Sequence, residues 1–345
     1  MKPPLRVLVV DDSALSIEAL TAALEADGDI SVIATAGDGR DALAKVEALR
    51  PALVAMDINM PVMDGLEAVE RIMASRPTPI LLLTGDPDRR GERGSFDALS
   101  RGALDLIPKH IAAGGEAQRA WLRDHVRLLA SVPVVYRPRP AHRLHAGGVV
   151  PSVAAGAGGV GLVASTGGPP VIADILAALP ADFALPILVV QHLAPGFTAH
   201  FTSWLDGVSR LRVRIAQSGL EVEGGTVYLA PDGGHLLLEG ANRLRIDSRS
   251  PPMDGHRPSG TMLLASLAQA WGRRAVGVVL TGMGSDGVTG LDEIRRAGGL
   301  TMAQDEASSV VYGMPRTARD RRAASTILAP AAIAEALIRR GRTGG

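Results

Sequence analysis

The sequence predicts an α/β protein made of two domains, each built on a parallel sheet with helices on both faces. Its 345 residues are too many for one average domain of about 150 residues. Short β-branched runs alternate with amphipathic stretches in both halves of the chain. Aromatic residues are only 3% of the chain, a composition typical of aliphatic sheets covered by alanine-rich helices.

Five apolar runs follow one another in the N-terminal part of the chain, each separated from the next by an amphipathic stretch. They are Val7–Val10, Val32–Thr35, Leu53–Met56, Ile80–Leu83 and Leu104–Ile107. Continuous apolar runs of this length indicate strands buried on both faces, as in a parallel sheet. The pattern predicts a (βα)5 doubly wound domain over residues 1–124, and a helical pattern continues to Ala130.

Proline and glycine become frequent in the middle of the chain, from Ser131 onward. Pro133 and Pro138 come first, and the stretch Ala146–Gly161 is rich in glycine and valine. This composition predicts a linker, which we place at residues 125–155. A linker of that length would let the two domains change their mutual orientation.

A second α/β series predicts a C-terminal domain over residues 156–345. Its strand-like runs are Val160–Ala164, Ile187–Gln191, Thr226–Ala230, Val276–Thr281 and Leu300–Ala303. Between the third and fourth runs, His235–Glu239 and Arg243–Asp247 flank the turn-forming residues 240–242, which predicts an antiparallel hairpin. The expected fold is a doubly wound parallel sheet with this hairpin added.

Charge and composition exclude several classes of function. Lys and Arg total 36 and so do Asp and Glu, so no polybasic surface is predicted for nucleic acid or for an anionic membrane. The chain has no cysteine, so a nucleophile must be oxygen or nitrogen, and a reducing cytoplasm suits such a protein. Residues 1–4 lead into a short apolar run that is neither a signal peptide nor a membrane span. We therefore expect a cytoplasmic protein without membrane insertion.

Polar residues follow four of the predicted strands of the N-terminal domain. Asp11 and Asp12 follow the first strand, Asp57 the third, Thr84 the fourth and Lys109 the fifth. The carboxyl ends of parallel strands meet at one edge of a sheet, so these side chains should converge. Crowded carboxylates repel one another unless a divalent cation and the lysine offset their charge. Each residue alone could be a helix cap or a solvated end, but together they predict a Mg²⁺ site at which Asp57 accepts a phosphoryl group.

A serine, a histidine and an aspartate follow predicted strands of the C-terminal domain. Ser165 stands between a strand and a glycine turn that opens a helix, where it can act as a nucleophile or only cap the helix. His192 directly follows the second strand and can act as a general base. Asp286, in the glycine loop after the fourth strand, can orient the histidine. The three strand ends predict a hydrolytic triad in the chain order Ser, His, Asp.

Three motifs of the N-terminal domain, VLVVDDSA, MDINMPVMDGLEA and GALDLIPK, resemble those of two-component receiver domains. The resemblance implies that Asp57 is the phosphoacceptor and that a histidine kinase is the phosphodonor. The implied Mg²⁺ ligands are Asp11, Asp12, Asp57 and the carbonyl of Asn59, and the implied switch residues are Thr84 and Lys109.

Two positions depart from the receiver pattern. Leu106 stands where many receivers have an aromatic residue that turns inward on phosphorylation, so the switch should propagate differently. His110 follows Lys109, where receivers usually have a proline in a cis peptide. A cis bond before a residue other than proline costs about 3 kcal/mol, so we expect a trans bond here and a displaced Lys109.

Six motifs of the C-terminal domain resemble the catalytic domain of the chemotaxis receptor methylesterases, the CheB family, from Gly159 to Arg339. They are GVGLVASTGGP, VVQHLAPGFT, LAPDGGHL, DGHRPS, LTGMGSDG and AQDEASSVVYGMP. The resemblance implies an enzyme that removes methyl groups from glutamate side chains of chemoreceptors and also deamidates glutamines there. The implied partners are the methylated cytoplasmic domains of these receptors, and hydrolysis needs no cofactor. The unphosphorylated receiver is expected to cover the Ser165 cleft.

The same resemblance assigns roles to single residues: Ser165 as nucleophile, His192 as base, Asp286 as its orienter, and the amides of Thr166 and Met283 as the oxyanion hole. His256, in DGHRPS, should line the substrate cleft without being a second base, because one histidine base suffices. After Ser259 the family usually continues with Val-Asp, whereas this chain has Gly260 and Thr261. That departure leaves the natural receptor substrate open.

Two other interpretations use the same sequence features. The chain could be a receiver joined to a module that binds without hydrolysing, a phospho-dependent adaptor, which the intact triad disfavours. Gly156, Gly158 and Gly161 also fit the dinucleotide-binding pattern GxGxxG. That pattern must follow a strand and open a helix, whereas here it precedes a strand, so nucleotide binding is disfavoured as well.

Overall fold

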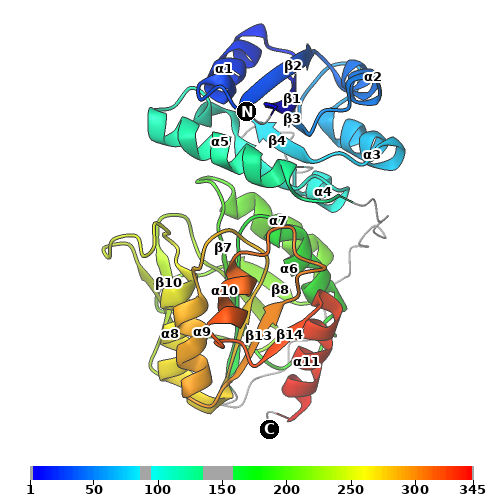
Figure 1. Ribbon diagram of the computed structural model, residues 1–345. Coiled ribbons are helices and arrows are strands. Elements are labelled where there is room, and N and C mark those ends of the chain that lie inside the picture. Colours follow the sequence, from blue (N-terminus) through cyan, green and yellow to red (C-terminus); the bar gives the residue numbers. More distant parts are fainter. Residues whose placement is uncertain (1–2, 86–94, 135–157, 344–345) are drawn as a thin grey trace. The chain divides into compact units, whose positions relative to one another are not determined.

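A computed structural model describes residues 3–85, 95–134 and 158–343 of the chain. The chain divides into two compact units, one within residues 1–140 and one within residues 141–345 (Figure 1). The last helix of the N-terminal unit, α5, runs over Glu116–Ala130 and so continues past the predicted domain end at residue 124. Most of the predicted linker, and Gly156 with it, falls in residues 135–157, outside the described residues.

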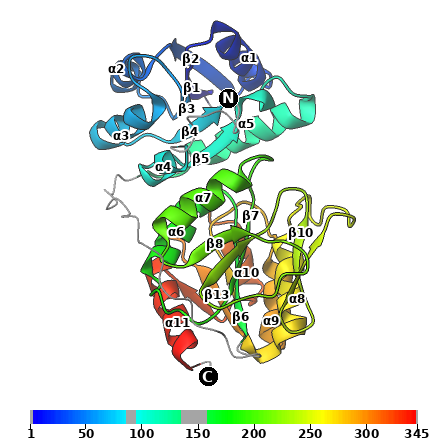
Figure 2. The ribbon, with the colours of Figure 1, turned by 180° about the vertical axis from the view of Figure 1, so that it is seen from behind.

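The N-terminal unit is built on a five-stranded parallel sheet in the order β2-β1-β3-β4-β5. Its strands are β1 (Leu5–Val10), β2 (Ile30–Ala36), β3 (Leu53–Asp57), β4 (Ile80–Thr84) and β5 (Asp105–Pro108). Its helices are α1 (Ala14–Glu25), α2 (Gly39–Leu49), α3 (Gly65–Ser75), α4 (Ser95–Ser100) and α5. Helices α1 and α5 pack together on one face of the sheet, and α2 and α3 cover the other (Figures 1 and 2). The predicted (βα)5 doubly wound fold is confirmed.

Polar side chains fix the points at which the first three helices begin. The side chains of Ser13, Asp38 and Asp64 accept hydrogen bonds from amides in the first turns of α1, α2 and α3. These amides have no partner within the helix, so the caps satisfy donors that would otherwise need water. Each cap therefore also fixes the loop that joins a strand end to the next helix.

The C-terminal unit is built on a seven-stranded parallel sheet in the order β14-β13-β12-β6-β7-β9-β8. Its strands are β6 (Gly159–Ala164), β7 (Ile187–Gln191), β8 (Arg212–Ile215), β9 (Thr226–Leu229), β12 (Ala275–Val279), β13 (Leu300–Gln304) and β14 (Thr326–Leu328). Its helices are α6 (Gly168–Ala178), α7 (Thr198–Val208), α8 (Gly260–Trp271), α9 (Val288–Arg296), α10 (Met314–Asp320) and α11 (Pro330–Thr343). Helices α8, α9 and α10 cover one face of this sheet, and α6, α7 and α11 cover the other (Figures 1 and 2).

The strand order of this sheet reverses direction at β6. From β6 the chain first proceeds through β7, β8 and β9 on one side, and then returns to place β12, β13 and β14 on the other. In open α/β sheets the loops at such a switch point diverge and leave a crevice beyond the carboxyl ends of the strands. The fold therefore puts the loops after β6, β7 and β12 at the natural position for a binding site.

Two edge strands of this sheet, β8 and β14, were not predicted from the sequence. Both are short and partly exposed, so they lack the continuous apolar run that identifies a central strand. The predicted hairpin is confirmed: β10 (His235–Glu239) and β11 (Arg243–Asp247) pair antiparallel. In the part of the chain that the structure describes, no helix combines the length and the apolar character needed to cross a bilayer.

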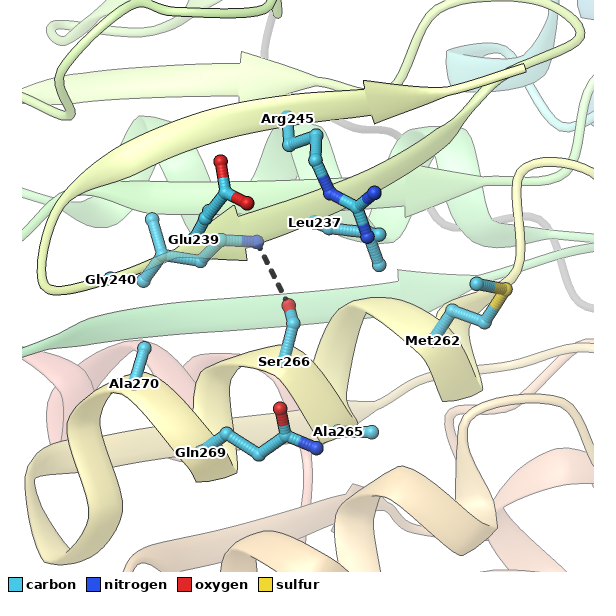
Figure 3. A pocket seen from close by; sticks show the side chains of 10 residues that line it. Leu237, Glu239, Gly240, Arg245, Met262, Ala265, Ser266, Gln269 and Ala270 are labelled. Atoms are coloured by element: carbon cyan, nitrogen blue, oxygen red, sulfur yellow. Dashed lines mark hydrogen bonds between the residues drawn. The ribbon is translucent and has the colours of Figure 1, made fainter. Parts of the chain in front are cut away.

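The hairpin packs beside α8 and forms with it an open pocket of about 480 Å³ (Figure 3). The Leu238 amide donates a hydrogen bond to Ser266 Oγ at 2.9 Å, which ties the hairpin to the helix. Glu239 and Arg245 line the pocket from the hairpin, and Gln269 lines it from α8. The residues predicted for catalysis are not among those that line this pocket. The hairpin and α8 nevertheless flank the segment that carries His256.

Candidate active site and candidate metal centre

The three residues of the predicted triad lie at the carboxyl edge of the seven-stranded sheet. Ser165 follows β6, His192 follows β7, and Asp286 lies in the loop between β12 and α9. Because β6 pairs with β7 on one side and with β12 on the other, the three loops are neighbours. The Ser165 amide donates to the Thr281 carbonyl, and the His192 amide donates to the Ala164 carbonyl, each at 3.0 Å. Backbone hydrogen bonds thus fix how these loops approach one another.

Asp286 is 1% exposed and lies against the N-terminus of α8. Its Oδ1 accepts hydrogen bonds from Ser259 Oγ at 2.8 Å and from the Thr261 amide at 3.0 Å, and its Oδ2 accepts one from the Gly260 amide at 2.6 Å. The positive end of a helix dipole stabilises a carboxylate at this position. Burial by itself would raise the pKa of Asp286, but His192 and the two amides lower it well below its usual range. Asp286 is therefore ionised.

His192 contacts Asp286 through one ring nitrogen. Its Nε2 lies 2.9 Å from Asp286 Oδ2, and because an ionised carboxylate only accepts, Nε2 must carry the proton. In the neutral ring the other nitrogen, Nδ1, then holds the free lone pair. Nδ1 is buried, and none of the described residues provides it with a hydrogen-bond partner. The pair of Asp286 and His192 is thus formed, while no hydrogen bond yet joins His192 Nδ1 to Ser165.

Two glycine loops pack against Ser165. Gly167 has a φ of 74°, a conformation that glycine adopts at no steric cost, and so the chain can turn sharply from Ser165 into α6. A Cβ atom at Gly282 would lie 2.7 Å from the Cβ of Ser165, so a larger residue would push the loop after β12 away from the serine. Thr166 belongs to the first loop and Met283 to the second. The fold therefore places one of the two predicted oxyanion residues on each loop.

Two polar side chains that were not predicted from the sequence brace these loops. The buried Gln191 donates from Nε2 to the carbonyls of Ser165 and His192, both at 2.9 Å. Thr281 is fully buried and donates from Oγ1 to the Thr166 carbonyl at 3.0 Å. Each is a polar residue at the end of an apolar run, and that position was the only signal the sequence offered. Together they fix the backbone at Ser165 and at the residue that follows it.

Residues 259–261, noted in the sequence only for a departure from the family pattern, hold Asp286. Gly260 and Thr261 do so through backbone amides, which every residue except proline possesses. Thr261 also accepts a hydrogen bond at Oγ1 from the Gly287 amide at 2.8 Å, which ties α8 to the loop that carries Asp286. The departure at these two positions therefore leaves the contacts to Asp286 in place.

Three aspartates of the N-terminal unit converge at the carboxyl edge of its sheet. Ligand oxygens of Asp11, Asp12 and Asp57 all lie within 4.8 Å of one another. Lys109 Nζ lies 2.8 Å from Asp11 Oδ2 and 2.8 Å from Asp57 Oδ2. Asp11 and Asp57 are buried, whereas Asp12 is exposed. Carboxylates that outnumber the neighbouring ammonium and open to solvent on one side match the oxygen ligands that Mg²⁺ prefers.

The electrostatics of Asp57 and Lys109 are coupled. Burial raises the pKa of Asp57, and Asp11 adds to this increase, although Lys109 acts against it. Burial disfavours the charged form of Lys109, but its bonds to Asp11 and Asp57 outweigh burial and raise its pKa. Asp57 also accepts one amide hydrogen bond, from Ile58 at 2.8 Å. The negative charge of Asp57 is therefore only partly compensated within the protein.

The other predicted receiver residues lie on or next to strands of the same sheet. Thr84 is fully buried at the end of β4, Asn59 is exposed just after β3, and Leu106 is buried on β5. The Lys109–His110 peptide is trans, because the cis peptide found among the described residues precedes Pro258. Lys109 nevertheless reaches both Asp11 and Asp57. The predicted displacement of Lys109 is therefore wrong: a trans bond at this position still allows its flexible side chain to reach the cluster.

Comparison with known proteins gives matches over both units. A family model described as CheB methylesterase matches residues 160–337, and one described as response regulator receiver domain matches residues 7–116. A protein-glutamate methylesterase/protein-glutamine glutaminase of Myxococcus xanthus is 45% identical over 93% of this chain and 89% of its own. Another, from Anaeromyxobacter dehalogenans, is 47% identical over 97% of this chain and 96% of its own.

A solved structure matches the C-terminal unit. The crystal structure of the Thermotoga maritima CheB methylesterase catalytic domain is 35% identical, with a TM-score of 0.51, and covers 53% of this chain and 98% of that domain. A receiver domain followed by a hydrolase domain defines the chain as a response regulator with an enzymatic output. The chain belongs to the CheB methylesterase family. The family resemblances that the motifs carried are confirmed.

Proposed function

We propose that this chain is a phosphorylation-regulated protein-glutamate methylesterase that demethylates chemoreceptors and deamidates glutamines in them. The observation that carries the proposal is the ionised Asp286, bound to His192 at the sheet edge where Ser165 also lies. The substrate class follows from the family, because relatives that are 45% and 47% identical are named methylesterase/glutaminases. The adaptor alternative is not favoured, since a module that only binds has no use for such a pair.

In the first half of the reaction, Ser165 Oγ attacks the carbonyl carbon of the methyl ester and its proton passes to His192 Nδ1. The imidazolium that forms is stabilised by Asp286, which also keeps the ring in the correct orientation. The ester carbonyl oxygen becomes an oxyanion, and the amides of Thr166 and Met283 donate hydrogen bonds to it. The leaving methoxide takes the proton from Nδ1 and departs as methanol, so an acyl group remains on Ser165.

In the second half, His192 Nδ1 removes a proton from water, and the resulting hydroxide attacks the acyl group. Ser165 Oγ leaves and recovers its proton from Nδ1, so the products are the free enzyme and a glutamate on the receptor. With glutamine as substrate, the nitrogen takes the proton in the first half and departs as ammonia. Both reactions pass through a tetrahedral oxyanion, so the same residues serve both.

Phosphorylation would act on the N-terminal unit. Asp57 is the proposed phosphoacceptor, with a histidine kinase as donor, and Thr84 and Lys109 are the proposed switch residues. Asp11, Asp12, Asp57 and the Asn59 carbonyl would hold Mg²⁺, in agreement with the close approach of the three carboxylates. Bound there, Mg²⁺ would offset the negative charge that a phosphoryl group brings to the cluster. Among the residues that the structure describes, Lys109 supplies the positive charge that contacts both Asp11 and Asp57.

The proposed partners are the cytoplasmic domains of methylated chemoreceptors and a histidine kinase. Glutamate methyl esters and glutamines on such domains would meet the enzyme in the cytoplasm. The balanced totals of 36 basic and 36 acidic residues support a protein partner over nucleic acid or a lipid surface.

Methanol released from methylated receptor tests the proposal directly. We expect the wild-type chain to release methanol faster when acetyl phosphate and Mg²⁺ are present, and the Ser165→Ala variant to release none above background. Ammonia released from an unmethylated receptor that carries glutamines measures the second activity. A folded wild-type chain that binds receptor but releases neither product would support the adaptor alternative instead.

A further inference from the structure

A second histidine covers one face of His192. The ring centroids of His192 and His256 are 3.8 Å apart, and the two ring planes differ by 3°. The His192 side chain is only 11% exposed, and His256 is half-buried. Parallel rings at this distance are in van der Waals contact. His256 thus closes one side of the His192 ring to water.

The single hydrogen bond from His192 to Asp286 does not fix the plane of the ring. The contact at Nε2 fixes the position of one atom, and the ring can still turn about its Cβ–Cγ bond, whose axis passes close to Nε2. Nδ1 has no hydrogen-bond partner among the described residues that would prevent this rotation. A flat ring packed on its face resists this rotation, because turning the His192 ring would drive its edge into His256.

His256 is itself held by its backbone. Met253 and His256 exchange two hydrogen bonds, from the His256 amide to the Met253 carbonyl at 2.9 Å and from the Met253 amide to the His256 carbonyl at 3.1 Å. The two residues between them, Asp254 and Gly255, have φ of 51° and 81°. Two successive positive φ angles are characteristic of the tight hairpin turn in which Asp-Gly is favoured. The turn therefore fixes the position from which the His256 ring extends.

The segment 253–261 contacts both His192 and Asp286, the two residues proposed to activate Ser165. At one end His256 stacks on His192. At the other end, Ser259, Gly260 and Thr261 donate three hydrogen bonds to Asp286. One continuous stretch of chain thus sets the carboxylate and the plane of the imidazole relative to each other.

We propose that His256 is a positioning residue for the hydrolysis, whose ring fixes the plane of His192 and so holds Nδ1 in the orientation from which it takes the proton of the Ser165 hydroxyl. This inference rests on the proposed function of the same site, and it assigns His256 a role through its shape and not through proton transfer. Reactions between positioned groups depend steeply on alignment, since a shift of about 1 Å can cost roughly 100-fold in rate.

The surroundings of His256 favour the neutral form of its ring, which is the form that can stay stacked on His192. Burial lowers the pKa of His256, and the neighbouring His192 lowers it further, whereas Asp286 and Asp254 act in the opposite direction. Arg257 points away, toward the carbonyls of Ser248 and Ser250 at 3.4 and 3.3 Å. A neutral ring can remain stacked while His192 takes up the serine proton, because two adjacent positive rings would repel.

The kinetics of methanol release from methylated receptor, measured on the full chain, test this role. We expect His256→Ala to lower kcat by about 10- to 100-fold, with KM little changed, because the ring acts on the alignment of the base and not on receptor binding. His256→Phe keeps a flat ring without ionisable nitrogens, so it should recover most of the lost kcat. Arg249→Ala is the matched control, since Arg249 is exposed in the same loop and its described hydrogen bond comes from its backbone amide.

Two results would overturn the proposal. One is a His256→Ala enzyme with the kcat of wild type, and the other is a folded His256→Phe enzyme that is as slow as His256→Ala. If His256→Ala does not fold, as judged by its thermal melting curve, the Phe variant alone decides between the two outcomes. Nitrogen-15 spectra of the His192 ring give a readout that needs no activity: its signals should broaden in His256→Ala and stay sharp in His256→Phe. Sharp signals in both variants would contradict the positioning role, whereas a wild-type enzyme without activity but with these spectral changes would contradict only the proposed function.

Discussion

Asp57 and Asp286 are both buried at the carboxyl edge of a parallel sheet, yet their pKa values shift in opposite directions. Asp57 is 3% exposed and Asp286 is 1% exposed, so burial does not distinguish them. Asp286 accepts three hydrogen bonds from the start of α8 and a fourth from His192. Asp57 has Lys109 and a single amide, and it faces the carboxylate of Asp11. The number of donors, and not the depth of burial, decides which carboxylate is stable as an anion.

The difference agrees with the two proposed roles. A group that orients a histidine through a catalytic cycle must remain ionised, and the contacts of Asp286 ensure this. A group that receives a phosphoryl group and a metal ion needs unused lone pairs and incomplete charge compensation, which Asp57 has. The same edge of the same kind of sheet thus supports a permanent anion in one unit and a reactive one in the other.

The largest effect should come from removing the charge of Asp286. An asparagine at this position keeps the shape of the side chain but presents His192 with the wrong tautomer, so Asp286→Asn should lower kcat for methanol release by about 10⁴-fold. The measurement is the initial rate of release from methylated receptor. If kcat falls by less than about tenfold, the contact between Asp286 and His192 has only a structural role. The proposed difference in role between Asp286 and Asp57 would then be wrong.

The next effect concerns Asp57. Asp57→Ala should abolish the stimulation of methanol release by acetyl phosphate and Mg²⁺, which we expect to be about 5- to 150-fold in the wild-type chain. Rates are compared with and without the phosphodonor for each protein. Equal stimulation of mutant and wild type would exclude Asp57 as the phosphoacceptor.

A smaller effect should follow from Mg²⁺ binding without phosphorylation. If the three carboxylates hold the ion, saturating Mg²⁺ should raise the Tm of the N-terminal unit by roughly 5 °C in calorimetry of the full chain. Asp12→Asn should reduce this increase, and because Asp12 is exposed the variant should fold normally. The same increase in wild type and variant would place the ion elsewhere.

The smallest effect is on stability at acid pH. The folded-state pKa of Asp286 lies below its usual value of 3.8, so the folded protein binds this proton less readily than the unfolded chain does. The stabilisation that Asp286 provides is therefore complete above about pH 4 and is lost as the pH falls further. The difference in free energy of unfolding between wild type and Asp286→Asn should shrink over that interval. A difference that does not change with pH would show that Asp286 is not stabilised as an anion.

The sequence was sufficient to locate the central strands and the residues at their ends. Apolar runs located the central strands, and residues at strand ends such as Ser165, His192 and Asp57 could be assigned to a sheet edge because parallel strands bring their carboxyl ends together. The edge strands β8 and β14 were missed because their exposed positions interrupt the apolar run. A strand can thus be predicted from the sequence where all of its residues are buried and form a continuous apolar run.

The hydrogen bonds that determine the chemistry of the site could not be predicted from the sequence in the same way. The amides of Gly260 and Thr261 that hold Asp286 have no signature in residue type, since the backbone carries them. Nor does the sequence reveal that Asp286 binds Nε2 and leaves Nδ1 open, because ring orientation depends on the loop that carries His256. These details arise from the conformation of the loops, which no pattern of residue types specifies.

Trapping the acyl-enzyme tests the central claim, that His192 and Asp286 activate Ser165, most directly. The full chain is mixed with methylated receptor, quenched in acid within the first turnover, digested and examined by mass spectrometry for a receptor peptide bonded to the protein. We predict an ester between a receptor glutamate and Ser165 in the wild-type chain, and none in a folded His192→Ala variant. An adduct on any other residue, or methanol release in the first turnover without an adduct on Ser165, would contradict the account.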